Sequence, residues 1–200
     1  MFTNVGSWML FVDGENFTCR AQELSGSVLR ESDHHMRDCF VWFAEKHAFE
    51  PLCFNDYPLD ISGYALRSFY YTSVQGSDEK QAQAIGALHK IGFQPYVFRK
   101  HGNQRRPKGV DIALATDFLA NAFDKNSDVA VLVAGDGDYV PMVNEAKRRG
   151  RAVYVVFFRS GLDERLRLAA DVFVDIEYEF RRGWQQLADR IEAKVRQSNE

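Results

Sequence analysis

The sequence has few cysteines and no apolar segment long enough to cross a membrane. Cys19, Cys39 and Cys53 are odd in number and form no CxxC pair, which argues against a disulfide framework and against a zinc ribbon. The longest uninterrupted apolar run, Ala152 to Phe158, is far shorter than the about 18 residues that span a bilayer, and no basic segment precedes a signal-like core. We therefore expect a soluble cytoplasmic protein that makes no membrane contact and carries no signal peptide.

The histidines near the cysteines do not suggest a zinc site either. His34, His35 and His47 lie on either side of Cys39, but no two pairs of ligands have the spacing of a zinc finger. We expect these histidines at the surface and Cys39 in the core, because aromatic residues follow it directly.

Charge is nearly balanced over the whole chain, with a formal net charge of -3, but it is unevenly distributed. Residues 99–108 include several basic side chains and no acidic one: Arg99, Lys100, Arg105, Arg106 and Lys108. Such a segment attracts phosphates through Coulomb forces that salt weakens, so it suits a nucleic-acid backbone better than the reading of bases. The alternative is an ordinary solvated loop.

Apolar runs alternate with helical patterns along most of the chain. The 200 residues, 46% of them hydrophobic, are enough for one domain with a substantial core. Near-continuous apolar runs are typical of strands buried on both faces of a parallel sheet, and they predict strands at Trp8–Val12, Ala65–Thr72, Phe93–Phe98, Val129–Ala134 and Ala152–Phe158. Helical patterns between them predict helices at Gly14–Leu24, His34–His47, Asp78–Ile91, Asp111–Phe123 and Tyr139–Arg149. This alternation predicts a three-layer α/β/α sandwich with a mainly parallel sheet of about five strands.

Three further segments complete this organisation. A short sixth strand is expected at Val172–Asp175, after a charged helical stretch at Asp163–Ala169. Residues 50–62 break the periodicity and contain two prolines, which predicts an insertion. Residues 178–200 place apolar side chains at spacings of three and four, which predicts an amphipathic helix that packs on the body or forms a homodimer contact.

Carboxylates follow the apolar runs at three places. In open parallel sheets the ligand crevice lies outside the carboxyl ends of the strands, so residues at those ends are the first candidates for a site. Asp13 ends the first strand with Asn16 in the following turn, and Asp136 and Asp138 follow the fourth strand. Asp111 lies in the first turn of the helix after the basic segment. We expect these three groups to meet at one edge of the sheet.

Each carboxylate also has a structural explanation when taken singly. Asp13 and Asp138 could cap helices, Asp136 could form a turn, and Asp111 could favour a helix N-terminus. Asp117 lies about 120° around the helix axis from Asp111. Both aspartates can therefore border one crevice only if that crevice wraps around the helix. Taken together, at one predicted edge, the carboxylates favour a functional site.

Such a cluster requires a positive partner. Two carboxylates held ~4 Å apart cost about 4 kcal/mol at an effective dielectric constant of about 20. Magnesium or manganese prefers oxygen ligands and is usually held by a few carboxylates, water and substrate phosphate. The metal could activate water and neutralise charge on a phosphodiester, while the basic segment holds the backbone. The sequence therefore predicts a metal site that hydrolyses nucleic acid.

Three motifs occur in the order FVDGEN, KGVDIALATDFL and VLVAGDGDYVPMVNEAKRRGRAVYVV. They resemble the NYN domain family, relatives of the PIN nucleases, and within it the LabA-like branch. The resemblance implies a PIN-like, Rossmann-like domain over residues 1–177 and a Mg²⁺- or Mn²⁺-dependent ribonuclease activity on single-stranded or structured RNA. It further implies an acidic cluster of Asp13, Asp111, Asp136 and Asp138, with Asn16 and Lys108 as substrate contacts.

Other functions fit the sequence less well. A haloacid-dehalogenase-like phosphatase also begins with a strand that ends in aspartate, but it needs a second aspartate two residues on, where this chain has Glu15. A dinucleotide-binding domain needs a GxGxxG turn after the first strand, and only Gly14 is present there. A regulatory module that binds RNA without cutting it remains the main alternative.

Overall fold

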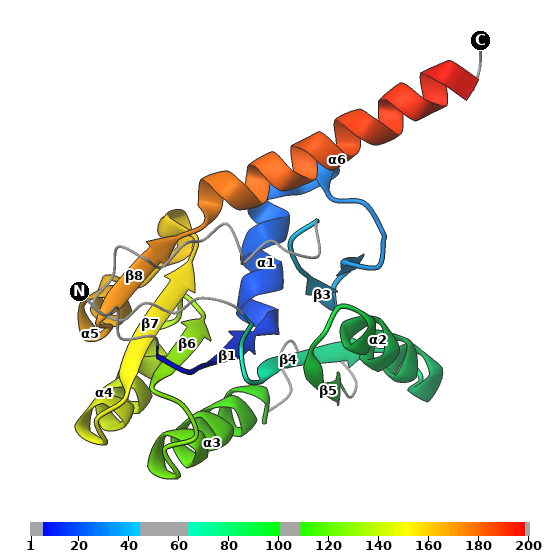
Figure 1. Cartoon of the computed structure of the whole chain (residues 1–200). Coiled ribbons are helices and arrows are strands. Elements are labelled where there is room, and N and C mark those ends of the chain that lie inside the picture. Colours follow the sequence, from blue (N-terminus) through cyan, green and yellow to red (C-terminus); the bar gives the residue numbers. More distant parts are fainter. Residues whose placement is uncertain (1–5, 45–63, 101–108, 199–200) are drawn as a thin grey trace.

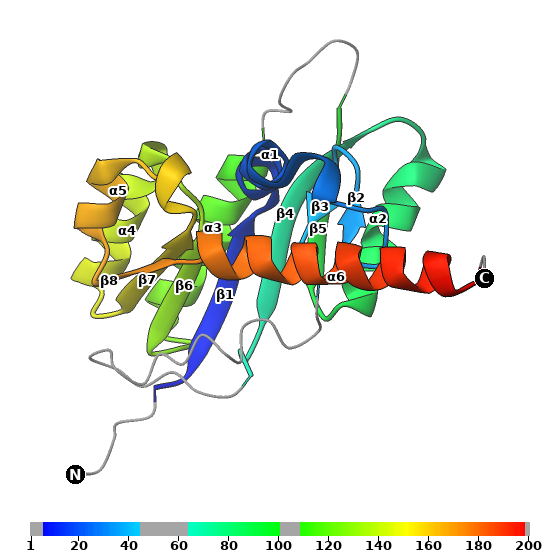
Figure 2. The same ribbon diagram turned by 90° about the horizontal axis from the view of Figure 1, so that it is seen from above.

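The computed structural model describes residues 6–44, 64–100 and 109–198, with one central sheet and helices on both of its faces (Figures 1 and 2). In these ranges six strands form the sheet in the order β5-β4-β1-β6-β7-β8, and each neighbouring pair is parallel. The strands are β1 Trp8–Asp13, β4 Ser68–Gln75, β5 Gln94–Lys100, β6 Val129–Val133, β7 Ala152–Phe157 and β8 Val172–Asp175. The predicted α/β/α sandwich is confirmed, and the sheet includes the expected sixth strand.

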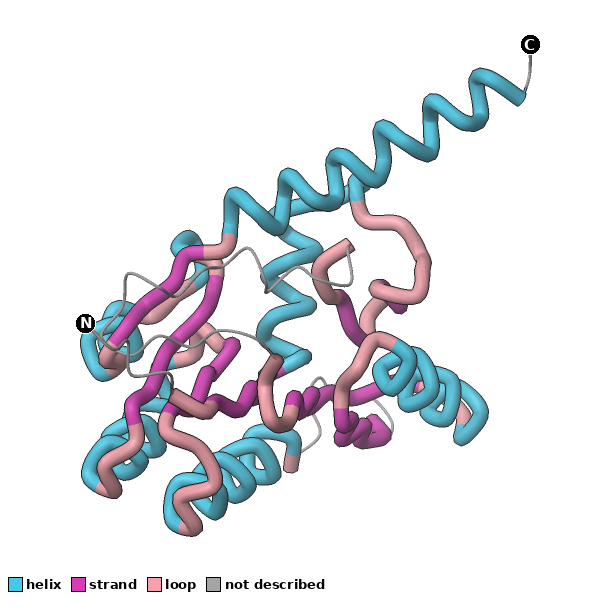
Figure 3. The backbone as a smooth tube through the Cα atoms, viewed as in Figure 1, coloured by secondary structure: helices cyan, strands magenta, loops and turns pink. Residues whose placement is uncertain are grey.

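The helices divide between the two faces of the sheet, as Figure 3 shows. Their bounds are α1 Gly14–Ser25, α2 Asp78–Lys90, α3 Val110–Phe123, α4 Val140–Arg148, α5 Glu164–Ala169 and α6 Glu177–Ser198. Short 3-10 turns are η1 Gly26–Val28, η3 Gly137–Tyr139 and η4 Arg159–Gly161. Helices α3, α4 and α5 pack on one face, and α1, α2 and α6 pack on the other.

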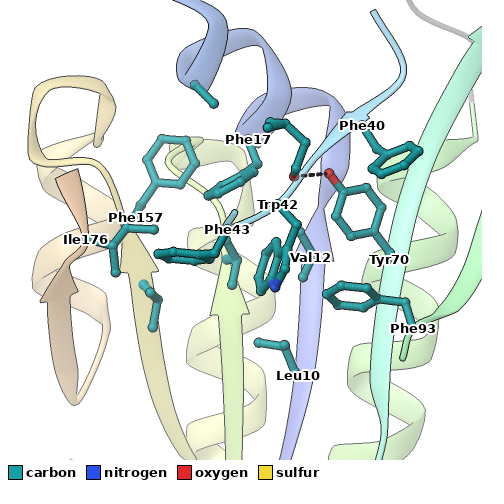
Figure 4. Packing of buried hydrophobic residues seen from close by; sticks show 14 of the residues in the cluster. Leu10, Val12, Phe17, Phe40, Trp42, Phe43, Tyr70, Phe93, Phe157 and Ile176 are labelled. Atoms are coloured by element: carbon teal, nitrogen blue, oxygen red, sulfur yellow. Dashed lines mark hydrogen bonds between the residues drawn. The ribbon is translucent and has the colours of Figure 1, made fainter. Parts of the chain in front are cut away.

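The two central strands are buried along their whole length, which is why they read as continuous apolar runs. Side chains of β1 alternate, so Leu10 and Val12 join one core and Met9 and Phe11 join the other. Figure 4 shows the first core, where Leu10 and Val12 lie among large aromatic rings. Burial on both faces fixes the register of β1, and it fixes the position of the residue at its end.

The predicted helix at His34–His47 is wrong over its described part, residues 34–44. The chain there forms a small antiparallel hairpin of β2 His35–Met36 and β3 Phe40–Val41. Asp38 has a φ of 57°, which bends the chain between the strands. Residues 39–43 are all buried in succession, and a helix cannot bury five consecutive side chains on one face. Packing of this aromatic run therefore overrides its helical pattern.

Strands β4 and β5 also differ from the prediction, and β4 begins at Ser68 instead of Ala65. Strand β4 runs on to Gln75 instead of ending at Thr72, and β5 runs on to Lys100 instead of ending at Phe98. Pairing between these strands explains the extension, because Val74 pairs with Arg99 and Gln75 pairs with Lys100. The ends of β4 and β5 therefore reach beyond the end of β1, where Asp13 pairs with Tyr71.

The first half of α6 belongs to the core of the domain. Phe180 and Trp184 are fully buried, and Trp184 Nε1 donates a hydrogen bond to the carbonyl oxygen of Trp42 at 3.0 Å. Farther along the helix, Ile191 and Val195 are exposed, and Figures 1 and 2 show the end of the helix extending past the sheet. The predicted insertion at residues 50–62 lies outside the described residues. Among the residues described, no helix is both long enough and apolar enough to cross a bilayer.

Candidate active site at the carboxyl edge of the sheet

The Asp13 carboxylate lies where the central strand β1 meets α1. Its Oδ1 accepts a hydrogen bond from the backbone N–H of Asn16 at 3.0 Å, so Asp13 caps the helix. Its Oδ2 accepts the hydroxyl of Tyr139 at 2.9 Å. Burial raises the pKa of Asp13 to about 7, and the charges of Asp111 and Glu15 act in the same direction against the two hydrogen bonds. Asp13 is thus a helix cap whose negative charge is unfavourable at neutral pH.

Tyr139 connects Asp13 to Asp111. The Tyr139 hydroxyl lies 3.3 Å from Asp111 Oδ1, in the first turn of α3. One hydroxyl hydrogen cannot be donated fully to both carboxylates, and the shorter contact is the one to Asp13. Burial and the two nearby carboxylates raise the pKa of Tyr139, so the hydroxyl keeps its proton. Two carboxylates from distant parts of the chain therefore converge on one oxygen atom.

Asn16 fixes the exit of β6 against the start of α1. Its side-chain oxygen accepts a hydrogen bond from the backbone N–H of Gly135 at 2.8 Å. Gly135 is required there, because a Cβ at this position would collide with the Phe157 ring and the Gly161 carbonyl oxygen. Sequence reasoning gave Asn16 a contact with substrate, whereas the structure engages its amide oxygen with the backbone.

Asp136 and Asp138 lie in the turn that leaves the same edge. Asp136 Oδ1 accepts the backbone N–H of Asp138 at 3.0 Å and caps η3. Their charges contribute to raising the pKa of Arg165, after the larger effect of its hydrogen bond and ion pair with Asp163. A Cβ on Gly137 would collide with the side chains of Asp163 and Arg165, so α5 lies directly over this turn. An arginine therefore lies beside these two aspartates.

The described part of the basic segment is ion-paired. Arg99 pairs with Asp78, and Lys100 Nζ lies 3.1 Å from Glu15 Oε1. Both residues belong to β5, so the basic loop that the sequence predicted begins after Lys100 instead of at Arg99. The remaining predicted phosphate contacts, Arg105, Arg106 and Lys108, lie outside the described residues.

Asp117 contacts a different tyrosine from the one shared by Asp13 and Asp111. Its Oδ2 accepts the hydroxyl of Tyr71 at 2.8 Å. The Tyr71 ring stacks on Tyr96, with centroids 4.8 Å apart and planes 11° from parallel. Asp111 and Asp117 thus lie in different surroundings on α3, as their angular separation on the helix predicts.

The donor set can be tested for its fit to a divalent metal. Over the ranges that the structure describes, no three histidine, cysteine or acidic side chains lie close enough together to hold a metal ion. Asp13 and Asp111 do converge, and both supply the oxygen ligands that magnesium and manganese prefer. A cation there would also offset the unfavourable charge of buried Asp13. This pair fits a metal whose other ligands are water and substrate phosphate.

Sequence reasoning missed Tyr139 and Arg165. Tyr139 directly follows the acidic turn and reads as an ordinary aromatic at the start of a helix. The available signal for Tyr139 was its position directly after the DGD sequence, at the end of a predicted strand. Arg165 lies in a charged helical stretch whose packing over Gly137 could not be inferred from spacing.

The fold and the site define a PIN-like α/β domain with carboxylates at the ends of its central strands. Residues 7–177 match the NYN domain, and the chain belongs to this family of PIN-like nucleases.

Two similar proteins have no described activity. An uncharacterized protein of Methanocaldococcus jannaschii is 30% identical over 96 residues, which are 48% of this chain and 37% of that protein. The match therefore spans little more than a third of the relative's length. The crystal structure of a protein of unknown function from Vibrio parahaemolyticus is 22% identical, with a TM-score of 0.57, covering 90% of this chain and 98% of that one. This second likeness shows the fold.

Proposed function

We propose that the protein is a metal-dependent ribonuclease that hydrolyses RNA phosphodiester bonds at the carboxyl edge of its sheet. The observation that carries this proposal is the convergence of Asp13 and Asp111 on the Tyr139 hydroxyl, inside a NYN domain. Two acidic groups drawn to one point need a cation when both are charged, and that point lies where ligands bind in parallel sheets.

In this proposal Asp13 and Asp111 hold Mg²⁺ or Mn²⁺, with Asp136 as a further ligand. When bound, the cation supplies a water of lowered pKa and a counter-charge for the oxygens of the scissile phosphate. The Tyr139 hydroxyl occupies the point between Asp13 and Asp111 and gives way to the cation, and exposed Asp138 orients the attacking water or adds a ligand.

Cationic side chains bind the RNA backbone in this proposal. Arg165 lies beside the acidic turn and is 73% exposed at its side chain, so it can reach a phosphate there. Arg99, Lys100, Arg105, Arg106 and Lys108 supply further phosphate contacts. Asp117 serves as an additional acidic group at the border of the crevice.

A non-catalytic RNA-binding module is the second candidate. It is favoured by the exposed Arg165 side chain beside the acidic turn, because a cationic side chain can bind an RNA backbone whether or not a metal is present. A phosphatase that uses Asp13 as a nucleophile would need an acid two residues on, and Glu15 is ion-paired with Lys100. A covalent aspartyl-phosphate at Asp13 is the product that would identify such an enzyme.

Cleavage of labelled single-stranded RNA tests the proposal, with manganese, magnesium or a chelator present. We expect cutting that requires metal and is lost in an Asp13→Asn, Asp136→Asn double variant. Asp189→Asn is the matched control, because the exposed Asp189 lies on α6 and bonds Gln185, outside the proposed site. If wild-type protein and the double variant both bind RNA and neither cuts it, the nuclease is excluded and the binding module is supported.

Three finer assignments belong to the same proposal. The order of the three sequence motifs supports the LabA-like branch of the family. Cytoplasmic location is supported by the unpaired Cys19 and Cys39. The exposed apolar residues Ile191 and Val195 on α6 are the place where a homodimer contact would form.

A further inference from the structure

A small cavity lies beside the candidate active site, between α1, the end of β4 and the β2–β3 hairpin. Its volume is about 160 Å³, and its lining is Glu15, Thr18, Cys19, Gln22, Asp38, Cys39, Thr72, Ser73 and Lys100. That volume equals about five water molecules at about 30 Å³ each, which is too small for a dinucleotide or a cofactor. It has room for one small ring system.

The cavity continues the carboxyl edge on which Asp13 lies. Glu15 is in the first turn of α1, and its charge acts on Asp13. Lys100 is the last residue of β5, the strand that leads into the basic segment. Cys19 and Asp38 are exposed, whereas Cys39, Thr72 and Ser73 are buried, so the cavity has an open side and a closed one. Glu15 and Lys100 therefore place the cavity at the same edge of the sheet as Asp13.

One buried oxygen in the lining lacks a hydrogen bond. Ser73 Oγ has no partner within the part of the chain that the structure describes, whereas Glu15 Oε1 has Lys100 Nζ 3.1 Å away as an ion pair. A buried oxygen such as Ser73 Oγ is unusual, because an unmet hydrogen bond costs about 1–3 kcal/mol. A ligand with a suitable donor could satisfy Ser73 Oγ, and the Glu15 carboxylate can accept a further hydrogen bond beside its ion pair.

The charges of the lining argue against an anionic ligand. Among the lining residues that the structure describes, Glu15 and Asp38 outnumber Lys100, and burial raises the pKa of the Cys39 thiol to about 12, so it stays neutral. A phosphate would therefore meet net negative charge in the cavity. A neutral ligand with both a donor and an acceptor fits better.

We propose that this cavity binds one RNA base that carries a carbonyl next to a ring N–H, which means uracil or guanine. The Lys100 ammonium would donate to the carbonyl, and the Glu15 carboxylate would accept from the ring N–H. Adenine and cytosine present the opposite order, an amino donor beside a ring acceptor. In the orientation that uracil or guanine takes, they therefore place a donor against Lys100 and an acceptor against Glu15, and they must turn over to match the pair. This inference rests on the proposed function for its substrate, RNA, and adds base preference to it.

Base reading and phosphate binding by Lys100 predict different results. Loss of a phosphate contact weakens all RNA sequences alike, whereas loss of a base contact removes the preference between them. The test measures binding of short labelled oligo(U), oligo(A), oligo(C) and alternating GA RNA in chelator, so that cutting is not required. We expect wild-type protein to bind oligo(U) and GA RNA roughly tenfold more tightly than oligo(A) and oligo(C).

Two variants separate the cavity from general RNA affinity. Lys100→Gln removes the donor, and Cys19→Phe blocks the open side without touching the ion pair. In both variants the ratio of affinities between the preferred and the other RNAs should fall to near one. Lys90→Gln is the matched control, because Lys90 is also a lysine paired with an acid, 2.7 Å from Asp33. It should leave the preference unchanged.

The outcomes also separate this inference from the nuclease. Equal binding of all four RNAs, or a preference that survives Cys19→Phe, overturns the base-binding cavity even if metal-dependent cutting is found. A preference lost in both variants supports the cavity even if the protein cuts nothing. Failure to bind any of the RNAs overturns the cavity.

Discussion

Tyr139 donates its hydroxyl to Asp13 Oδ2 at 2.9 Å, and the same oxygen lies 3.3 Å from Asp111. A cation held by both carboxylates must take the place of that hydroxyl. Tyr139→Phe should therefore bind Mn²⁺ more tightly, by roughly fivefold, which corresponds to the ~1 kcal/mol of one hydrogen bond. Titration calorimetry with Mn²⁺ measures this.

The matched control for that variant is Tyr71→Phe, which removes a tyrosine hydroxyl bonded to Asp117 at 2.8 Å. It should leave Mn²⁺ affinity unchanged. Weaker Mn²⁺ binding in Tyr139→Phe would mean that the hydroxyl positions the ligand instead of competing with the metal.

The stability of the protein should depend on the protonation of Asp13. Its pKa is about 7 in the folded chain against 3.8 for the free side chain, so the folded state binds the proton more tightly. The resulting stabilisation is fully present below the unfolded pKa and is lost as pH rises through the folded one. The free energy of unfolding that is lost between these two pKa values approaches about 4 kcal/mol, because each unit of pKa shift corresponds to about 1.4 kcal/mol.

Asp13→Asn should remove this dependence while keeping an oxygen that can cap α1. We expect the variant to be more stable than wild type by a few kcal/mol at about pH 8, with the advantage falling toward about pH 5. Urea unfolding across that range measures it, with Asp117→Asn as control. An advantage that does not change with pH would contradict a raised pKa at Asp13.

Glycine at position 14 should be required for the full stability of the fold. A Cβ there would lie 2.7 Å from the Tyr71 carbonyl oxygen and would overlap the Tyr70 ring, and the backbone oxygen cannot move aside easily. Gly14→Ala should lower the free energy of unfolding by about 1–3 kcal/mol or more. Gly86, in the exposed part of α2, has nothing within 4 Å of such a Cβ. Gly86→Ala should instead raise stability by about 0.5–1 kcal/mol, and thermal unfolding of both compares them. A stable Gly14→Ala protein would contradict the close packing of α1 on β4.

The two halves of α6 should differ in their contribution to stability. Phe180 is fully buried, so Phe180→Ala should cost about 3–5 kcal/mol. Val195 is 53% exposed, and Val195→Ala should change stability by less than about 0.5 kcal/mol. Chemical denaturation measures both. A large effect of Val195→Ala that grows with protein concentration would instead indicate a dimer contact.

Sequence patterns were sufficient for the parallel sheet because its central strands are buried on both faces. In a chain of alternating strands and helices, continuous apolar runs with acidic ends, such as Trp8 to Asp13, indicate buried parallel strands. The same reasoning placed Asp13, Asp111 and Asp136 at one edge, since parallel strands end together. Their side-chain contacts were not predictable in this way.

The errors arose where tertiary contacts decide the local structure. The buried run Cys39 to Phe43 packs under α1 and α6 as a hairpin, although its local spacing also suited a helix. The ends of β4 and β5 depend on the pairing of these two strands, which cannot be predicted from the sequence of either strand alone. The role of Tyr139 depends on its hydrogen bond to Asp13, which is 126 residues away in the sequence.

The hydrogen bond from the Gly135 N–H to Asn16 joins the turn after β6 to the first turn of α1. The bond therefore links the segment that begins at Asp13 to the turn that contains Asp136, whereas Asp111 lies on α3. A fixed spacing between carboxylates distinguishes ions by radius, because Ca²⁺ needs longer bonds and more ligands than Mg²⁺. The small amide of Asn16 would then contribute to the choice of metal without touching the ion.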